Sequence, residues 1–508
     1  SAKTASGFSY TVREKLFNHV MDMGSEEMQD FSIPSLITRT TNDITQIQMI
    51  VSMGLQMIIK SPIMAVWAVI KILGKSWELS AVTAAFVVVI CVFVLAVMAT
   101  CIPRFRIVQK LTDKINRVAR ENLTGINVVH AFNAEKYQND KFDVPSKDMM
   151  NTQLKNQRMF ALMMPVMNIG MNGLTLAIYW LGAVLIQQIA LTAVQDRITF
   201  FSNVVVFSTY ATYVVMSFMM LVMIFMMLPA AQVSAERINE VLERDVNIKE
   251  GSVSEGREQG TVEFKNVSFR YPHASEDELS NISFKINKGQ TLAIIGATGS
   301  GKTTLISLIP RFYDVRQGEV LVDGVDVKEY PFSQLRGMIG IVPQKAVLFK
   351  GTIRHNMQWR DKNATDEDIW NALDIAQAKD FVEKKPDKLD EMILQEGKNL
   401  SGGQRQRLTI ARALVGDPEI LILDDSASAL DLATDARLRK AIHKKTSGMT
   451  VFIVSQRISS IKSADKIIVL DDGKIAGIGT HSELYNGCEV YKEICLSQLS
   501  EKEAQANG

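Results

Sequence analysis

The stretch Gly296-Ala297-Thr298-Gly299-Ser300-Gly301-Lys302-Thr303 decides the fold of the second half of this 508-residue chain. It fits the pattern G-x-x-x-x-G-K-[ST], follows an apolar strand-like run at 291–295, and precedes a helical pattern at 304–309. Its glycines allow backbone N–H groups to converge on phosphate oxygens. Lys302 is expected to reach the terminal phosphates, and the Thr303 hydroxyl to bind Mg²⁺. An ordinary glycine-rich turn is the alternative, and the flanking pattern favours a phosphate loop.

Composition separates the chain into two different halves. The net charge is +1, which gives no basic surface of the kind that binds nucleic acid. Long apolar runs lie in the first half, whereas the second half has the pattern of an α/β domain. The spacing of Cys91, Cys101, Cys488 and Cys495 fits neither a zinc site nor a disulfide framework, so reduced thiols are expected.

Residues 1–240 predict an all-α transmembrane domain. Four spans are expected at about 50–73, 79–102, 159–186 and 200–228. Lys60 and Pro62 interrupt the first span, and Lys60 is either functional within the membrane or placed at its interface. Lys and Arg are abundant in the connection at 104–158, so this connection and both chain ends are expected in the cytoplasm. A short break between helices is predicted at 31–36.

Two side-chain stripes follow helical spacing in the last two spans. Asn168, Asn172, Thr175 and Tyr179 form a polar stripe, and Met216, Met219, Met220, Met223 and Met227 form a second stripe. The polar stripe could line a wet cavity or bond another helix. The methionine stripe could accept apolar ligands of varied shape or contact lipid.

The second half shows further motifs in a fixed order. A polar linker at 241–260 precedes a domain at 261–495, and a flexible tail is expected at 496–508. The strand at 261–269 ends in Arg270-Tyr271-Pro272, and another apolar strand ends at Gln344. Next come Leu400-Ser401-Gly402-Gly403-Gln404, an aliphatic strand at 420–425 ending in Asp424-Asp425, Ser428-Ala429-Leu430-Asp431, and a buried-type strand at 451–456 ending in Ser455-Gln456.

This order resembles the ATP-binding cassette (ABC) family over residues 261–495. The first half resembles a B-type exporter, with Thr41-Asn42-Asp43, the run Glu121-Asn122-Leu123-Thr124-Gly125, the run Val129-His130-Ala131-Phe132-Asn133, and Ser234-Ala235-Glu236-Arg237 at family-like places. The resemblance implies an α/β P-loop nucleotide-binding domain after the helical domain. Half-transporters of this type have six spans, so the first two are expected to be missing from this chain.

The resemblance also implies roles for individual residues. Tyr271 would stack on the adenine of ATP, Asp424 would hold Mg²⁺ with Thr303, and Gln344 would sense the metal and the attacking water. The expected nucleotide-binding residues are Tyr271, Gly296, Thr298, Gly299, Ser300, Gly301, Lys302, Thr303, Thr304, Ser401, Gly402, Gly403, Gln404 and Asp431. The expected catalytic group is Asp425 with Gln344 and Gln456.

Asp425 and Gln456 depart from the family pattern. The family usually has Glu at the first position, as general base, and His at the second. Asp is one methylene shorter, by roughly 1 Å, and a misplacement of that order can cost about a hundredfold in rate. Gln donates a hydrogen bond but cannot become cationic. Slow hydrolysis at this chain's own site is therefore expected, with harmless variation as the alternative.

In the family that this chain resembles, each ATP lies between one chain's phosphate loop and the partner's signature, so the intact signature at 401–404 implies that the chain completes a partner's site. The resemblance implies a heterodimeric multidrug exporter in the cell membrane, whose partner half-transporter keeps the Glu and the His and whose substrate is a small amphipathic compound. Two alternatives remain: a regulatory or sensing subunit that binds ATP without transport, and an exporter of lipid or peptide.

Overall fold

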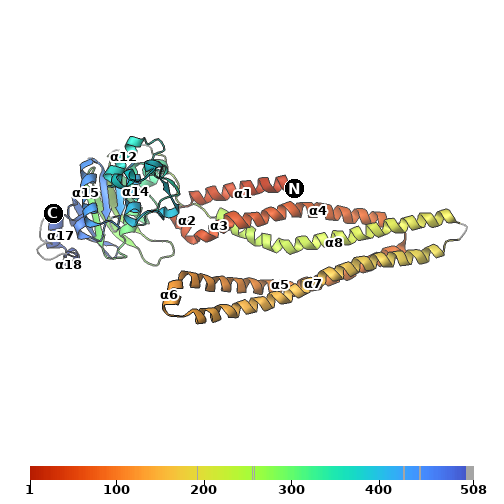
Figure 1. The fold of residues 1–508 in the computed structure, drawn as a ribbon. Coiled ribbons are helices and arrows are strands. Elements are labelled where there is room, and N and C mark those ends of the chain that lie inside the picture. Colours follow the sequence, from red (N-terminus) through yellow and green to blue (C-terminus); the bar gives the residue numbers. More distant parts are fainter. Residues whose placement is uncertain (191–192, 254–255, 257, 427–428, 446–447, 499–508) are drawn as a thin grey trace. The chain divides into compact units, whose positions relative to one another are not determined.

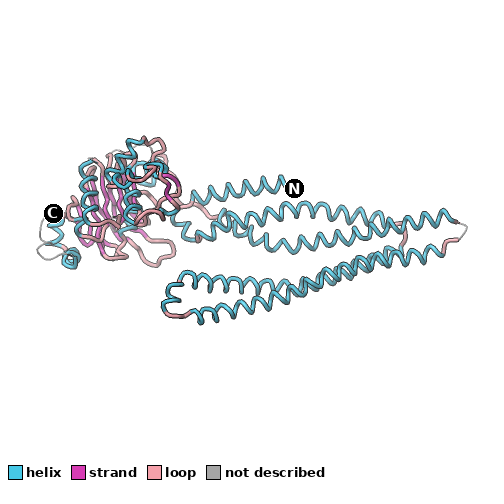
Figure 2. Tube along the Cα trace, in the orientation of Figure 1, coloured by secondary structure: helices cyan, strands magenta, loops and turns pink. Residues whose placement is uncertain are grey.

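The computed structural model describes residues 1–190, 193–253, 256, 258–426, 429–445 and 448–498. Packing divides the chain into two units. The helical unit contains Ser1–Val20 and Ile33–Glu243, and the C-terminal unit contains Met21–Ser32 and Arg244–Gly508. Figure 2 shows that the strands lie in the C-terminal unit and that the helical unit is built from long helices.

The helical unit consists of helices joined by short connections (Figure 1). Its elements are α1 (Ala2–Asp22), α3 (Ile33–Thr38), the π-helical turn η1 (Arg39–Asp43), α4 (Ile44–Ile72), α5 (Trp77–Thr124), α6 (Ile126–Ala131), α7 (Glu135–Gln187) and α8 (Val194–Leu242). Among the described residues, four segments are long and apolar enough to cross a bilayer: Ile33–Ile72, Trp77–Thr124, Glu135–Gln187 and Val194–Ile224. The four predicted spans overlap these segments.

The long helices pack in pairs, α4 along α8 and α5 along α7, and α7 also contacts α8. Large apolar side chains such as Ile178 and Phe207 are fully buried between them. Within α4, the Ser61 hydroxyl donates to the carbonyl of Ser217 on α8 at 2.6 Å, next to the interior Pro62. The helix continues through this proline to Ile72.

The predicted break at 31–36 is shorter in the structure. Only Phe31 and Ser32 separate α2 (Ser25–Asp30) from α3, and the rest of the predicted break is helical. Pro34 lies in the first turn of α3. A proline is tolerated there because the first N–H groups of a helix have no partner within it.

In the described residues, the C-terminal unit contains three sheets with helices packed around them (Figure 1). Its strands are β1 (Val262–Phe269), β2 (Leu279–Ile286), β3 (Thr291–Gly296), β4 (Gln317–Val322), β5 (Val325–Asp326), β6 (Ile339–Val342), β7 (Gly351–Thr352), β8 (Met392–Ile393), β9 (Ile420–Asp424), β10 (Thr450–Val454), β11 (Lys466–Asp471) and β12 (Lys474–Gly479). Its helices after α2 are α9 (Lys302–Ser307), α10 (Phe332–Met338), α11 (Ile353–Met357), α12 (Asp366–Ile375), α13 (Lys379–Glu383), α14 (Gly402–Leu414), α15 (Leu432–Lys445), α16 (Ile458–Ile461), α17 (His481–Gly487) and α18 (Glu489–Gln498). Short 3₁₀ turns occur at Val327–Glu329, Lys388–Asp390 and Gln395–Gly397.

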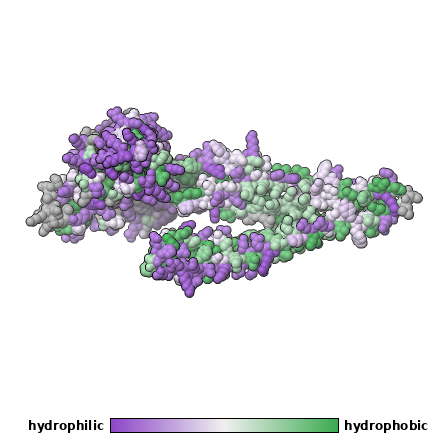
Figure 3. All heavy atoms as spheres, in the orientation of Figure 1, coloured by the Kyte–Doolittle hydropathy of each residue, from purple (hydrophilic) through white to green (hydrophobic). Residues whose placement is uncertain are grey.

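The central sheet has the strand order β12-β11-β3-β10-β9-β6. Neighbouring strands from β11 to β6 are parallel, and β12 is antiparallel to β11. Buried apolar side chains cover both faces, as expected for parallel strands covered by helices: Ile294, Ile422 and Phe452 belong to one core cluster, and Leu421 and Leu423 belong to another. The carboxyl ends of β3, β10, β9 and β6 therefore lie along one edge of the sheet. In Figure 3, hydrophilic residues cover much of the visible face of this unit, whereas apolar residues lie along the long helices.

Parts of the predicted boundaries fall outside the described residues. Ser428 of the Ser428 to Asp431 motif lies outside them, as do 254, 255 and 257 within the linker. Helix α18 extends to Gln498, so the first three positions of the expected tail are helical, and 499–508 are not described.

Gly182 allows α7 to approach α8 closely, and this contact gives a prediction. A Cβ atom added at Gly182 would lie 2.8 Å from Val204 of α8. Replacing Gly182 by Val should destabilise the helical unit by about 1–3 kcal/mol through overpacking, which thermal unfolding of the purified protein in detergent would measure. Gly74→Ala is not a suitable control because its φ is +88°, whereas Gly7→Val, at a site with open space, is suitable. Equal melting temperatures for Gly182→Val and Gly7→Val would contradict this packing.

Candidate functional site

The phosphate loop follows β3 and leads directly into α9. Gly299 and Gly301 have φ values of +85° and +89°, which favour glycine. A Cβ atom at Gly296 would lie 2.1 Å from the carbonyl oxygen of Leu470, so only glycine fits there. The glycines of the pattern are thus required by the path of the backbone, and the predicted loop forms.

Lys302 lies over this loop. Its Nζ donates to the carbonyl oxygens of Gly296 at 2.9 Å and Ala297 at 2.6 Å. Burial lowers the pKa of Lys302, and the charges of Asp425 and Asp424 oppose that effect. The ammonium group is therefore held at the centre of the loop, where phosphate oxygens would replace the carbonyls as its partners.

Thr303 and Asp424 join the loop to the next strand end. The Thr303 hydroxyl lies 3.2 Å and 3.1 Å from the two carboxylate oxygens of Asp424, the last residue of β9. Burial is the main cause that raises the pKa of Asp424. Hydroxyl and carboxylate oxygens are the ligands that Mg²⁺ prefers, and this cation usually takes only one or two of them together with substrate phosphates. The pair therefore fits Mg²⁺, which would neutralise the buried charge.

Asp425 has a backbone conformation that is unusual for a non-glycine residue, and its side chain is hydrogen-bonded. Its φ is +44°, and its N–H donates to the carbonyl of Val454 on β10 at 3.0 Å. Burial raises the pKa of the Asp425 carboxyl most strongly, whereas the charge of Arg457 and a side-chain hydrogen bond from Gln344 lower it. A non-glycine residue in this region of φ is held there by its surroundings and is frequent at functional sites.

These side chains share one cavity of about 180 Å³ at the carboxyl edge of the central sheet. It is lined by Glu278, Thr298, Gly299, Gly301, Lys302, Thr303, Thr304, Gln344, Asp424, Asp425, Val454 and Gln456. The structure thus brings together the predicted loop, metal and catalytic residues. Glu278 was missed because it follows no motif, and Arg457 was missed although it is the neighbour of Gln456.

Tyr271 lies beside this cavity and contacts the start of α9. Its hydroxyl is 2.9 Å from the Thr304 hydroxyl, and its ring packs edge to face with Phe269 and Tyr313 at 4.9 Å and 5.3 Å between centroids. Burial raises the pKa of the half-buried phenol. The ring is therefore well fixed for stacking on a planar base.

The signature residues lie apart from this cavity, at the N-terminus of α14. Ser401 and Gln404 cap the helix reciprocally: the Gln404 N–H donates to the Ser401 hydroxyl at 3.3 Å, and the Ser401 N–H donates to the Gln404 side chain at 3.0 Å. Gly402 faces open space, whereas a Cβ at Gly403 would lie 3.2 Å from the Ala429 carbonyl. Asp431 accepts the Thr434 N–H at 2.9 Å, and hydrogen bonds from the side chain and then the backbone of Thr434 lower the pKa of Asp431.

Models of two protein families match this chain. The model described as ABC transporter matches residues 279–428, and the model described as ABC transporter transmembrane region matches residues 1–218. The chain is 37% identical over 503 residues to an uncharacterized ABC transporter ATP-binding protein of Mycobacterium tuberculosis, covering 98% of this chain and 85% of that protein. The chain belongs to the ABC transporter family.

Two further comparisons agree with this assignment. The ABC transporter chain is 32% identical to an ATP-dependent lipid A-core flippase of Pseudomonas aeruginosa, over 95% of this chain and 79% of that protein. The solved structure of a bacterial Atm1-family ABC exporter with ATP bound has the same fold, with a TM-score of 0.79, 24% identity, and coverage of 98% of this chain and 87% of that chain.

The family assignment fixes the general character of both units. The helical unit of this ABC transporter spans a membrane, and its C-terminal unit is the cytoplasmic ATP-binding domain. Cys91, Cys101, Cys488 and Cys495 are all free, in agreement with the expected reduced thiols.

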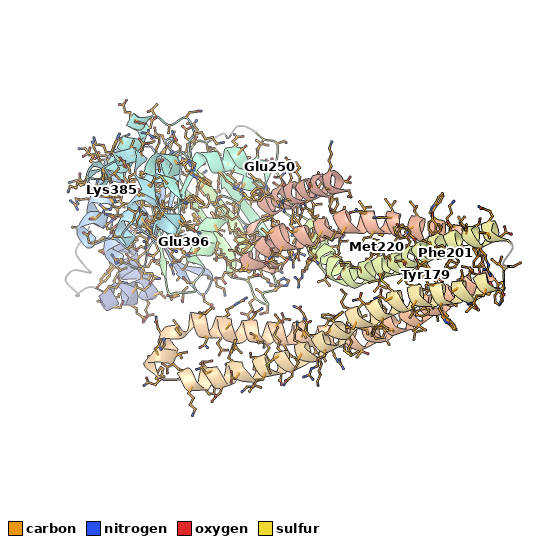
Figure 4. All side chains as sticks on the ribbon, turned by 45° about the vertical axis from the view of Figure 1, so that its right-hand side comes forward. Tyr179, Phe201, Met220, Glu250, Lys385 and Glu396 are labelled. Atoms are coloured by element: carbon orange, nitrogen blue, oxygen red, sulfur yellow. The ribbon has the colours of Figure 1, made fainter. Side chains whose placement is uncertain are left out.

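The two stripes in the spans remain accessible within this chain. Asn168 and Asn172 are exposed, and Tyr179 retains 40% of its surface, while Leu174 and Ile178 on another face of α7 are buried. The side chains of Met216 and Met223 on α8 are 42% and 46% exposed. Figure 4 shows Tyr179 on α7 and Met220 on α8. Lys60 is exposed, and α4 continues to Ile72 beyond it.

Tyr271 gives a prediction that separates stacking from hydrogen bonding. Tyr271→Ala should weaken ATP binding about tenfold, because stacking on an aromatic ring contributes roughly 1–3 kcal/mol. Tyr271→Phe keeps the ring, loses only the contact with Thr304, and should bind ATP nearly as well as the wild type. Titration with a fluorescent ATP analogue would measure both variants. An equal loss of affinity in both would show that the hydroxyl, and not the ring, is what matters.

Proposed function

We propose that this ABC transporter chain is one half of an ATP-driven heterodimeric exporter, and that its own site binds ATP and Mg²⁺ but hydrolyses ATP slowly. The environment of Asp425 carries this proposal. Its carboxylate accepts a hydrogen bond from Gln344 and faces Arg457, so it is already engaged by two groups. A general base must instead lie within hydrogen-bond reach of the attacking water.

The chemistry of Asp425 and Gln456, which depart from the family pattern, supports slow hydrolysis. Asp425 is one methylene shorter than Glu, so its carboxylate reaches roughly 1 Å less far toward the nucleotide. Gln456 lines the same cavity as Lys302 and Asp424 and can offer a hydrogen bond to a phosphate oxygen. It cannot carry a positive charge, so it stabilises developing negative charge less than a protonated His does.

ATP and Mg²⁺ have complementary partners in this site. Lys302 and the loop N–H groups would bind the phosphates, Thr303 and Asp424 would hold the metal, and Tyr271 would bind the base. The bound Mg²⁺ supplies charge neutralisation at the β- and γ-phosphates. Gln344 hydrogen-bonds Asp425 and lines the same cavity, so it would lie near the metal and the attacking water.

The placement of residues 401–404 supports a role for this chain in a partner's site. Ser401 and Gln404 cap α14, and Gly402 faces open space, so backbone N–H groups at this helix end are accessible to another molecule. A phosphate at such a helix end is stabilised by the free N–H groups. We propose that the partner half-transporter has the Glu and the His that this chain lacks.

Exposed aromatic surface also supports a partner. Phe349 and Trp359 stack at 3.9 Å between centroids and remain 41% and 54% exposed. At the tip of the α5–α7 hairpin, Leu123 and Phe132 are 76% and 77% exposed. Large exposed apolar side chains of this kind mark surfaces that another protein covers.

A small amphipathic substrate fits the accessible stripes on α7 and α8. Asn168, Asn172 and Tyr179 offer polar contacts, and the methionines offer flexible apolar surface beside them. A lipid is the second candidate, because the relative of Pseudomonas aeruginosa is named a lipid A-core flippase. Drugs and lipids share the amphipathic character that the stripes would recognise.

The division of labour between the two sites predicts different effects for two substitutions. In the complex with the partner half-transporter, Asp425→Asn should leave the ATPase rate within about twofold, because this site contributes little. Gly402→Leu fills open space in this chain and should lower the rate at least about tenfold by obstructing the partner's nucleotide. ATP turnover would be measured in lipid nanodiscs.

The matched control is Gly337→Leu, at another helical glycine with open space around it, and it should leave turnover unchanged. Equal losses from Asp425→Asn and Gly402→Leu would contradict the asymmetry. So would brisk turnover, comparable with the complex, in a preparation that contains only copies of this chain.

Transport in reconstituted vesicles tests the exporter function and its substrate class. Inside-out vesicles containing the complex should accumulate an amphipathic fluorescent dye when ATP and Mg²⁺ are present. A parallel assay would follow the flipping of a headgroup-labelled lipid. Movement of lipid without dye would favour the second candidate, and movement of neither would favour a sensing subunit that binds ATP without transport.

A further inference from the structure

The segment Met21–Ser32 lies early in the chain but packs as part of the ATP-binding unit. Glu27 of α2 is fully buried, and its two carboxylate oxygens accept the N–H groups of Asn247 and Gly24, each at 2.9 Å. Asp30 pairs with Arg244. These contacts fix α2 on the surface of the unit that binds ATP.

One side chain of α2 reaches toward the nucleotide side. The Gln29 amide donates to the Tyr313 hydroxyl at 3.1 Å. Tyr313 lies between α9 and β4, and its ring contacts Phe269 at 5.4 Å and Tyr271 at 5.3 Å between centroids. A continuous set of contacts thus runs from Tyr271 through Tyr313 to Gln29.

The other end of this set lies at the phosphate loop. The Tyr271 hydroxyl is 2.9 Å from the hydroxyl of Thr304, which follows the proposed Mg²⁺ ligand Thr303. Tyr313 therefore lies between Tyr271, which is proposed to bind the base, and Gln29 of α2. Neither Gln29 nor Tyr313 lines the cavity at the phosphate loop.

A second contact joins helix α2 to the segment that contains Tyr271. His273, two residues after Tyr271, lies 3.3 Å through its Nε2 from an Asp30 oxygen, and its φ of +62° reflects the tight turn after Pro272. The segment that would bind the base thus contacts α2 at adjacent residues, directly through His273 and indirectly through Tyr313.

We propose that Tyr313 and Gln29 are positioning residues that make the order of α2 depend on the adenine of ATP, and not only on its phosphates. This inference rests on the proposed binding of ATP at Tyr271. A base stacked on Tyr271 restricts that ring, the edge-to-face contact restricts Tyr313, and the hydrogen bond from Gln29 then holds α2. Coupling between two sites is reciprocal, so fixing α2 also favours binding of the base.

The comparison of two ligands isolates the contribution of the base. Magnesium tripolyphosphate has the phosphates of ATP but no adenine. Hydrogen exchange of the backbone amides in Met21–Ser32 would be followed by mass spectrometry on the full chain in lipid nanodiscs. We expect saturating ATP to slow this exchange about fivefold more than saturating tripolyphosphate does.

Substitutions at the two ends test the route. Gln29→Leu and Tyr313→Phe each remove the same hydrogen bond and should abolish the difference between the two ligands. Each should weaken ATP binding by the same factor of about five, and leave tripolyphosphate binding unchanged. The double variant should be no worse than either single variant, because both remove one interaction.

Gln317→Leu, at an exposed position of β4 in the same unit, serves as the control and should change neither measurement. Equal protection of α2 by ATP and tripolyphosphate in the wild type would overturn the inference. A loss of affinity for both ligands in Gln29→Leu would also overturn it, because it would show a merely structural role. If the wild type bound no ATP, the proposed function itself would fail instead.

Discussion

The contact between the Thr303 hydroxyl and both carboxylate oxygens of Asp424 joins the phosphate loop to the neighbouring strand ends, and the site depends on it. The contact exists because β3 and β9 both pair with β10 in parallel, so their carboxyl ends reach the same edge. Gln344 after β6 and Gln456 after β10 are brought to this edge by the same arrangement. Sheet topology therefore places residues separated by more than a hundred positions in one small cavity.

Within that cavity, similar residues have different roles. Asp424 meets a hydroxyl and faces the metal position, whereas the carboxylate of Asp425 is engaged by Gln344 and faces Arg457. Burial raises the pKa of both acids, so their charges are tolerated only because cations and donors surround them. The helical unit follows a related rule: the Ser61 hydroxyl satisfies a carbonyl of α8, and polar side chains of α7 stay on an accessible face.

Much of this arrangement could be predicted from the sequence because it depends on local pattern. The four spans follow from runs of apolar residues, and the phosphate loop follows from glycines that its backbone requires. Asp424 was predictable as the polar end of a buried aliphatic strand. The roles of Tyr313 and Arg457 were not predictable from the sequence. Tyr313 matters because it packs between segments that are distant in sequence, and Arg457 matters because its charge acts on Asp425. Ser401 and Gln404 have the S-x-x-Q spacing of a capping box, so this helix start was readable from the sequence, although only a nucleotide role was predicted for the two residues.

The assignment of Met21–Ser32 to the ATP-binding unit has a consequence for the covalent path of the chain. The polypeptide crosses between the two units after Val20, after Ser32 and after Glu243. A soluble fragment beginning at Arg244 would lack α2, and Asn247 and Tyr313 would then lose their partners Glu27 and Gln29. The ATP-binding unit of this protein is therefore discontinuous in sequence.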